Sequence, residues 1–340
     1  MSAPYPWLEP AWQRLVSASR QARLGHALLL AGRAGFGKRA FARAFAALLL
    51  CEADGAPPVA CGHCRGCELF AAGNHPDFLH IAPLEEGKAV AVDQIRELGD
   101  YFALRPHYRT TKIALIEAAD TMNRSAANAL LKLLEEPPAG ALIMLVADRP
   151  SALLPTVRSR CQQTPLDQAD PAVLLDWLLA QEGAADAPRE LEGLARAAGS
   201  PLQARALAAP QVAPLIDGLA PALAAVSTGR LAPLAAAAQF AALPLDILVD
   251  QMLRLCHEVL LLKTGAPLPL AALGREAPPG LQGLADALHS AQLSDFVQKA
   301  QEVKRLKLGS VTLREVDLAE WLWFDWQASA AGHPVDAAQR

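Results

Sequence analysis

The sequence lacks an excess of charge of either sign. Its 31 lysines and arginines are nearly balanced by 35 aspartates and glutamates, which gives a formal net charge of −4. This balance excludes a strongly basic protein that coats nucleic acid with its whole surface, because such binding requires many phosphate contacts from lysine and arginine. Any contact with DNA must therefore be local.

The sequence also lacks a long uninterrupted apolar segment. The amino terminus has no basic stretch followed by an apolar core, so we expect no signal peptide. The most apolar long window, 231–249, contains Pro233, Pro244 and Asp246 and is therefore a poor candidate for a membrane span. We expect a cytoplasmic protein that has no membrane partner.

What remains is a globular composition, with 52% hydrophobic and 19% charged residues over 340 positions. A chain of this length can form two or three domains. Residues 26–166 alternate short apolar runs with helical periodicity, which predicts an α/β domain with a parallel sheet. The runs expected as strands are 26–31, 77–81, 112–116, 141–147 and a short one that ends at Leu166. From residue 171 onward the pattern is helical only.

The stretch 26–39, HALLLAGRAGFGKR, joins a buried strand to a helix through a glycine-rich turn. Gly32, Gly35 and Gly37 let the backbone turn so that successive N–H groups point at one spot, and Lys38 supplies a positive charge for a phosphate. The spacing fits the phosphate-binding pattern G-x-x-x-x-G-K. A tight corner between strand and helix, without any ligand, is the alternative interpretation of these glycines.

Two residues that ATP hydrolysis requires are missing. Arg39 stands where this pattern needs Ser or Thr to bind Mg²⁺. The strand 112–116 is followed by Glu117, which could orient a metal ion, but Ala118 stands where a second carboxylate would polarise water. Hydrolysis by this chain alone is therefore not expected, and whether Lys38 binds a nucleotide stays open.

A group of cysteines indicates a structural zinc site. Cys61, Cys64 and Cys67 lie within seven residues of each other, and Cys51 precedes them. Disulfides are disfavoured in the cytoplasm, so these spacings favour tetrahedral thiolate coordination of Zn²⁺ with no position left for a catalytic water. Reduced cysteines packed as small apolar residues are the alternative.

Several motifs together resemble the clamp-loader branch of AAA+ proteins, found in the bacterial DNA polymerase III holoenzyme. They are LGHALLLAG at 24–32, the cysteine group at 51–67, HPD at 75–77, ANALLKLLEEPP at 127–138 and SRC at 159–161. A weaker match is the segment GSVTLREVDL that begins at Gly309.

The resemblance implies a RecA-like AAA+ P-loop domain at 1–168 with a zinc-binding insertion at 51–67. It further implies a small helical lid domain at 169–209, a helical collar domain for oligomerisation at 210–330, and a tail at 331–340. It also implies that Arg160 of the SRC motif acts in trans as an arginine finger, in contact with the γ-phosphate of ATP on a neighbouring subunit. Guanidinium suits that task because it is always charged and its fork matches phosphate oxygens.

The lid supplies a third departure from an active ATPase of this family. Active members carry an arginine in the lid motif G-S-x-R that senses nucleotide, and here Leu202 takes its place, with Arg205 displaced by three residues. We therefore expect a subunit that does not hydrolyse ATP but completes the site of a neighbour. The resemblance implies a hetero-pentamer with the gamma/tau motor subunits and the delta subunit, which acts on the sliding clamp and primed DNA within a DNA-directed DNA polymerase (a nucleotidyltransferase).

Two other functions remain possible from the sequence. The chain could be an active gamma/tau-like ATPase motor, because Lys38 and the three glycines are kept. It could also be a zinc-centred DNA-binding module, although only Arg65 is basic within 61–67.

The last helix, expected at 311–326, should carry Leu318, Trp321 and Leu322 on one side. Its tryptophans suggest either a core or a subunit interface.

Overall fold

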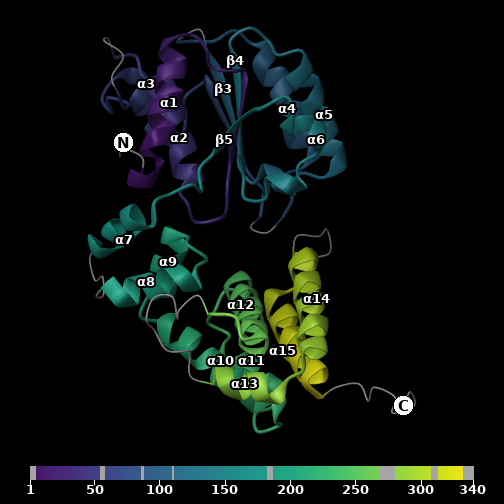
Figure 1. Cartoon of the computed structure of the whole chain (residues 1–340). Coiled ribbons are helices and arrows are strands. Elements are labelled where there is room, and N and C mark those ends of the chain that lie inside the picture. The colour runs from purple at the N-terminus through teal and green to yellow at the C-terminus, as the bar shows by residue number, and fades with distance from the viewer. Residues whose placement is uncertain are drawn as a thin grey trace. The chain divides into compact units, whose positions relative to one another are not determined.

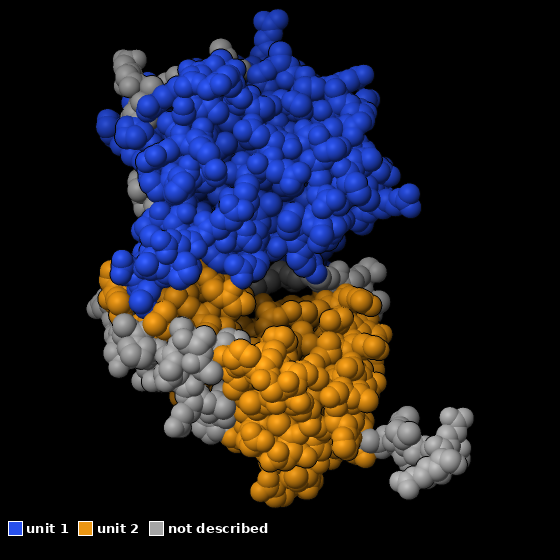
Figure 2. Space-filling model, in the orientation of Figure 1, with its two compact units in different colours: residues 1–177 blue, residues 178–340 orange. Residues whose placement is uncertain are grey.

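A computed structural model of the chain describes residues 5–53, 58–85, 88–108, 111–181, 187–268, 280–307 and 313–331. Their contacts divide the chain into two compact units, residues 1–177 and residues 178–340 (Figure 2). The finer division into domains at 168, 209 and 330 stays a prediction. Most of the predicted tail, at 332–340, and the first part of the segment from Gly309 lie outside the described residues.

The first unit is built on a parallel sheet of five strands in the order β2-β3-β4-β1-β5. The strands are β1 (Ala27–Ala31), β2 (Phe78–Ile81), β3 (Lys112–Ile116), β4 (Ala141–Ala147) and β5 (Gln162–Pro165). Every residue of β1, β3 and β4 is buried, because helices cover both faces of a parallel sheet. The five strands agree with those expected from the sequence to within one or two residues.

Helices lie on both faces of this sheet (Figure 1). One side carries α1 (Glu9–Arg20) and α2 (Lys38–Leu50), with α3 (Arg65–Ala71) beside them. The other side carries α4 (Val92–Ala103), α5 (Arg124–Glu135) and α6 (Pro155–Arg158). Asn123 caps α5, since its side chain accepts a hydrogen bond from the Ala126 N–H at 2.9 Å.

The described part of the first unit also contains three short 3₁₀ turns, at Pro6–Leu8, Ala119–Thr121 and Pro150–Ala152. The helix α7 (Pro171–Leu179) crosses the boundary between the two units. It begins at residue 171, where the sequence pattern becomes helical only.

The described part of the second unit is helical. Its helices are α8 (Ala187–Arg196), α9 (Pro201–Leu207), α10 (Ala213–Ser227), α11 (Pro233–Gln239), α12 (Leu245–Thr264), α13 (Leu281–Ala287), α14 (Ser290–Lys307) and α15 (Glu315–Ala331). The predicted combination of an α/β part and an all-α part is thus confirmed. No helix among the described residues is both long and apolar enough to cross a bilayer.

Helix α15 corrects one expectation about the tryptophans. Trp323 and Trp326 are buried, and the Trp326 Nε1–H donates to the Leu223 carbonyl at 3.0 Å. Trp321, expected on the same side as Leu318 and Leu322, is instead 55% exposed beside the exposed Phe324. The buried residues of α15 include Leu318, Leu322 and Trp326. Trp321 lies about 100° around the helix from Leu322, on the side away from Trp326, so its indole falls outside the buried face.

Candidate functional site

The predicted phosphate loop, residues 32–38, joins β1 to α2 at the carboxyl end of the sheet. Gly32, Gly35 and Gly37 have φ values of 145°, 76° and 82°, in the range that only glycine adopts readily. A Cβ atom at Gly32 would lie 2.9 Å from the Asp167 side chain, and one at Gly37 would collide with the Tyr5 ring. The three glycines therefore adopt backbone conformations that favour glycine, and the loop is closely packed by other parts of the chain.

The chain's own carboxylates bind the donors that a phosphate would use. The Lys38 side chain is 2% exposed, and its Nζ lies 2.6 Å from Asp148 Oδ1. The same Nζ donates to the Arg33 carbonyl at 2.5 Å. The Arg33 backbone N–H donates to Asp167 Oδ2 at 3.1 Å. Lys38 and one loop amide are thus already satisfied without a ligand.

Aromatic side chains cover the outside of the loop. Tyr5 and Trp7 stack with their ring centroids 4.8 Å apart, and Trp177 packs edge-on against both rings. The Trp7 Nε1–H donates to the Phe36 carbonyl at 2.9 Å, which fixes the cluster to the loop. Trp7 and Tyr5 thus pack directly against the loop, and Trp177 packs against both of them.

The two positions that would hold Mg²⁺ in an active ATPase are paired with each other. Arg39 Nε lies 3.5 Å from Glu117 Oε2, and His80 Nε2 lies 3.0 Å from Glu117 Oε1. The hydrogen bond from His80, together with the charges of Arg39 and Arg43, holds the pKa of Glu117 below its usual value. A guanidinium thus neutralises the carboxylate that could otherwise orient a metal ion.

Arg160, the predicted arginine finger, lies on the surface just before β5. Its side chain is 37% exposed, and Nη2 forms an ion pair with Glu135 Oε1 at 2.8 Å. Nη1 donates to the Thr156 carbonyl at 3.1 Å. The next residue, Cys161, is buried, which raises its pKa to about 11 and leaves its thiol neutral.

The sheet register separates Arg160 from this chain's own phosphate loop. Leu28 near the start of β1 pairs with Gln162 at the start of β5, so Arg160 precedes the amino ends of the strands. The phosphate loop follows the carboxyl end of β1. A strand of five residues is about 16 Å long, so the two groups lie at opposite ends of the sheet. Arg160 therefore cannot act on a ligand in the loop of its own chain.

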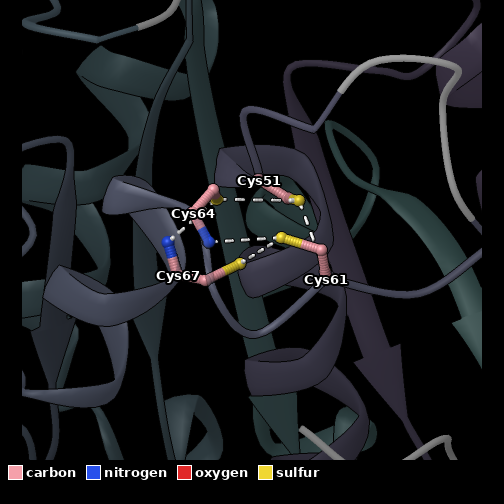
Figure 3. Close-up of side chains that lie close together, drawn as sticks. All are labelled: Cys51, Cys61, Cys64 and Cys67. Atoms are coloured by element: carbon pink, nitrogen blue, oxygen red, sulfur yellow. Dashed lines mark hydrogen bonds between the residues drawn. The ribbon is translucent and has the colours of Figure 1, made fainter.

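The four predicted zinc ligands converge on one point (Figure 3). The Sγ atoms of Cys51, Cys61, Cys64 and Cys67 all lie within 4.8 Å of one another. Cys61 and Cys67 are 3.9 Å apart at Sγ, as are Cys51 and Cys64. Tetrahedral Zn²⁺ with bonds of about 2.3 Å would separate its sulfur ligands by about 3.8 Å. The four residues therefore fit a closed zinc site.

Backbone amides donate hydrogen bonds to the cysteine sulfurs of this cluster, which favours the thiolate form. The N–H groups of Glu52, Cys61, Cys64 and Cys67 each donate to a cysteine sulfur at 3.4 Å. Hydrogen bonding from the His63 backbone lowers the pKa of Cys61 to about 6, whereas burial raises that of Cys67 to about 12. Metal binding would have to deprotonate the Cys67 thiol.

The HPD motif lies directly before β2 and is bound to the first residues of the sheet, since the Asp77 carbonyl accepts a hydrogen bond from the Ile113 N–H at 2.9 Å. Asp77 is fully buried, and its carboxylate accepts hydrogen bonds from the backbone N–H groups of His107 and Tyr108 at 2.8–2.9 Å. His75 is also buried, and its Nδ1 accepts from the Asp77 N–H at 3.1 Å. A Cβ atom at Gly66 would lie only 2.6 Å from the Leu50 carbonyl, so this turn of the cluster requires glycine. The motif has a structural role here.

Sequence reasoning missed Asp148, Asp167, Tyr5 and Glu135. Asp148 directly follows β4, and Asp167 follows β5 by two residues, so the topology of a parallel sheet brings both toward the loop after β1. In the sequence, the only feature that marks these two aspartates is that each follows a segment expected to be a strand. Arg205, which we did not assign as the lid sensor, donates to Gln181 at 3.1 Å, and Arg65 lies 4.0 Å from Glu68.

Comparisons with known proteins agree with the motifs. Residues 7–170 match the family described as DNA polymerase III, delta subunit. The DNA polymerase III subunit delta′ of Pseudomonas aeruginosa is 43% identical over 209 residues, which are 61% of this chain and 62% of that protein. The delta′ subunit of Escherichia coli K12 is 37% identical over 60% of each chain.

A subunit with another name is also similar. The DNA polymerase III subunit tau of E. coli K12 is 35% identical over 184 residues, which are 53% of this chain and 28% of that protein. The chain thus spans about three fifths of the length of the delta′ relatives it matches. The predicted resemblance to the clamp-loader proteins of DNA polymerase III is confirmed, and delta′ subunits are among the proteins that the chain resembles.

Proposed function

We propose, from the relationship of residues 7–170 to the DNA polymerase III delta subunit family, that this chain is the delta′ subunit of a bacterial clamp loader. In this proposal the chain is a stator, meaning a subunit that binds its neighbours and assists their ATP hydrolysis without hydrolysing ATP itself. It would assemble in a hetero-pentamer with gamma/tau motor subunits and the delta subunit. The assembly would place the sliding clamp on primed DNA in the cytoplasm, as part of the polymerase holoenzyme.

The pairing of Arg39 with Glu117 carries the proposal. In P-loop ATPases, Mg²⁺ bridges the phosphates and neutralises the charge that develops during transfer. A guanidinium 3.5 Å from Glu117 supplies a fixed positive charge at that carboxylate, so Mg²⁺ and Arg39 would repel each other. The binding of Lys38 to Asp148 and the missing carboxylate at Ala118 support the same conclusion.

The position of Arg160 supports a role in trans. It is exposed, it carries a permanent charge, and it lies at the end of the sheet opposite its own phosphate loop. A neighbouring subunit that presents its own loop to this end would bring a bound triphosphate to Arg160. The cysteine cluster would bind structural zinc, because four thiolates leave no open position on the metal.

Reconstitution of the complex with Arg160→Ala tests this role. We expect ATP hydrolysis stimulated by DNA to fall steeply, since loss of an arginine finger costs about three to five powers of ten at the affected site in related NTPases. Arg158→Ala is a matched control, because Arg158 lies two residues away on α6 and should leave the rate unchanged. Wild-type hydrolysis and clamp loading in the Arg160→Ala complex would refute the assignment.

The similarity to tau keeps an active motor as the second candidate. The three glycines of the phosphate-binding pattern have positive φ values, which is compatible with such a motor. A motor would require Lys38 to leave Asp148 and Mg²⁺ to displace Arg39 from Glu117. Phosphate release by the purified chain alone distinguishes the two candidates.

A further inference from the structure

The guanidinium of Arg160 is held by groups of its own chain. Glu135, the last residue of α5, binds Nη2 at 2.8 Å, and Nη1 donates to the Thr156 carbonyl at 3.1 Å and to Ser159 Oγ at 3.5 Å. The chain thus satisfies both terminal nitrogens without a neighbour. Of these three partners, only Glu135 carries a charge.

A carboxylate and a phosphate compete for the same nitrogen atoms. Both are oxyanions that accept short, charge-assisted hydrogen bonds from guanidinium. Glu135 Oε1 occupies a position at Nη2 that a phosphate oxygen would take. The carboxylate would also repel an approaching triphosphate, because like charges a few ångströms apart destabilise each other. Contact of Arg160 with a phosphate therefore requires the pair with Glu135 to open.

The exposure of the pair makes such opening easy. The side chains of Arg160 and Glu135 are 37% and 52% exposed. Ion pairs with this much access to water contribute about 0.2–1 kcal/mol, which corresponds to a factor of about 1.4 to 5 in an equilibrium constant. The pair is thus strong enough to bias the arginine and weak enough to release it when a neighbouring subunit docks.

We propose that Glu135 is a positioning residue that tethers the Arg160 guanidinium to its own subunit until a neighbouring triphosphate displaces it. This inference rests on the proposed function of Arg160 as an arginine finger. It adds that hydrolysis is restrained by an intramolecular competitor of that finger. Removal of the Glu135 charge should therefore favour the free arginine.

Chemical labelling of the isolated full-length chain tests the tether directly. Phenylglyoxal modifies guanidinium groups, and peptide mass spectrometry measures the rate at each arginine. We expect Glu135→Gln to speed modification of Arg160 by about 1.4- to fivefold. Arg158 in the same peptide region serves as the internal reference, and Glu136→Gln, an exposed neighbour at the end of α5, is the matched control. An unchanged rate at Arg160 would overturn the proposal.

The reconstituted complex supplies the second measurement. Without primed DNA, we expect Glu135→Gln to raise kcat for ATP by about 1.4- to fivefold, with KM within twofold of the wild type, because the finger acts mainly in the transition state. A residue that only supports the fold would not raise kcat. An unchanged or lower kcat would overturn the tether.

The two measurements separate this inference from the proposed function. If Arg160→Ala abolishes hydrolysis while Glu135→Gln behaves as the wild type in both assays, the finger stands and the tether is wrong. If Arg160→Ala leaves hydrolysis intact, the proposed function fails, and the labelling rate alone decides whether Glu135 restrains Arg160.

Discussion

At the scale of single residues, Lys38 occupies the lysine position of a phosphate-binding pattern, but its ammonium group binds to other residues of its own chain. Its ammonium group is almost completely buried and is held by Asp148 and the Arg33 carbonyl. A buried charge is costly unless it is paired, so the loop depends on this ion pair. The same residue that would bind a nucleotide in an active relative thus fixes the end of β4 to the phosphate loop.

Asp148→Ala should reveal this dependence. The substitution leaves the Lys38 ammonium buried without its carboxylate, and we expect the free energy of unfolding to fall by about 1–2 kcal/mol, since Asp148 itself is half exposed. Urea denaturation measures the change. Asp93→Ala is the control, because Asp93 forms an exposed pair with Arg96 and should cost less than about 0.5 kcal/mol. Equal effects of the two substitutions would contradict this account of Lys38.

The pH dependence of Glu117 gives a second prediction at this scale. Its folded-state pKa is lowered by the hydrogen bond from His80, so its contribution is complete above the unfolded-state pKa of about 4.3 and is lost as the pH falls through the lower folded-state value. We expect the stability difference between the wild type and Glu117→Gln to shrink from pH 6 to pH 3, as measured by urea denaturation at each pH. A difference that is constant over this range would show that the carboxylate is not stabilised.

The sequence predicted those functional positions that lie in local patterns. Arg39 and Ala118 replace residues that hydrolysis requires. They lie at fixed distances from a glycine-rich loop and a strand, so the replacements can be recognised without a structure. Asp148 and Asp167 lie more than 100 residues after the loop that they contact. Their role depends on the strand order, which places β4 and β5 on either side of β1 and which the alternation of strands and helices does not specify.

At the scale of elements, the cysteine cluster orders a segment that has few apolar residues of its own. Cys64 caps α3 by accepting a hydrogen bond from the Cys67 N–H, so one residue both begins the helix and faces the metal position. Glu52 accepts from the Gly66 N–H at 3.0 Å and so joins the end of α2 to the same turn. Binding of zinc would hold together these connections, which are weak individually.

Cys64→Ser should remove this order without unfolding the sheet. We expect one zinc ion per wild-type chain by elemental analysis and loss of that ion in the variant. Hydrogen exchange should then speed up at the amides of 61–71, while β3 and β4 keep their protection. Cys161→Ser is the control, because Cys161 lies outside the cluster and should leave the metal content unchanged. A variant that retains zinc, or that loses protection throughout the sheet, would contradict this role.

The sequence predicted elements well where burial is uniform and less well where a helix is apolar on most of its surface. Continuous apolar runs identified β1, β3 and β4, since both faces of a parallel sheet are covered. In α15, apolar and aromatic residues occur on nearly every side, so spacing did not show that Trp321 faces solvent while Trp323 faces the core. The contacts with Phe240 and Phe296 that select the buried tryptophans come from distant segments.

At the scale of the whole molecule, the first unit has two chemically different ends. At the carboxyl end of its sheet lies a phosphate loop in which Lys38 pairs with Asp148 and a backbone amide binds Asp167. At the amino end lies the exposed Arg160. Subunits that join one such end to the opposite end of the next form a head-to-tail contact, which generates rings when the rotation closes. In such a ring this chain would contribute an arginine to a neighbour's site while its own loop stays inactive.

Phosphate release from ATP by the purified chain, with Mg²⁺ and without other subunits, tests this asymmetry most directly. Arg39 forms an ion pair with the Glu117 carboxylate, and Ala118 cannot polarise water. We therefore predict that phosphate is released from ATP no faster than in buffer alone. Saturable release that requires Mg²⁺ and disappears in Glu117→Gln would contradict the account.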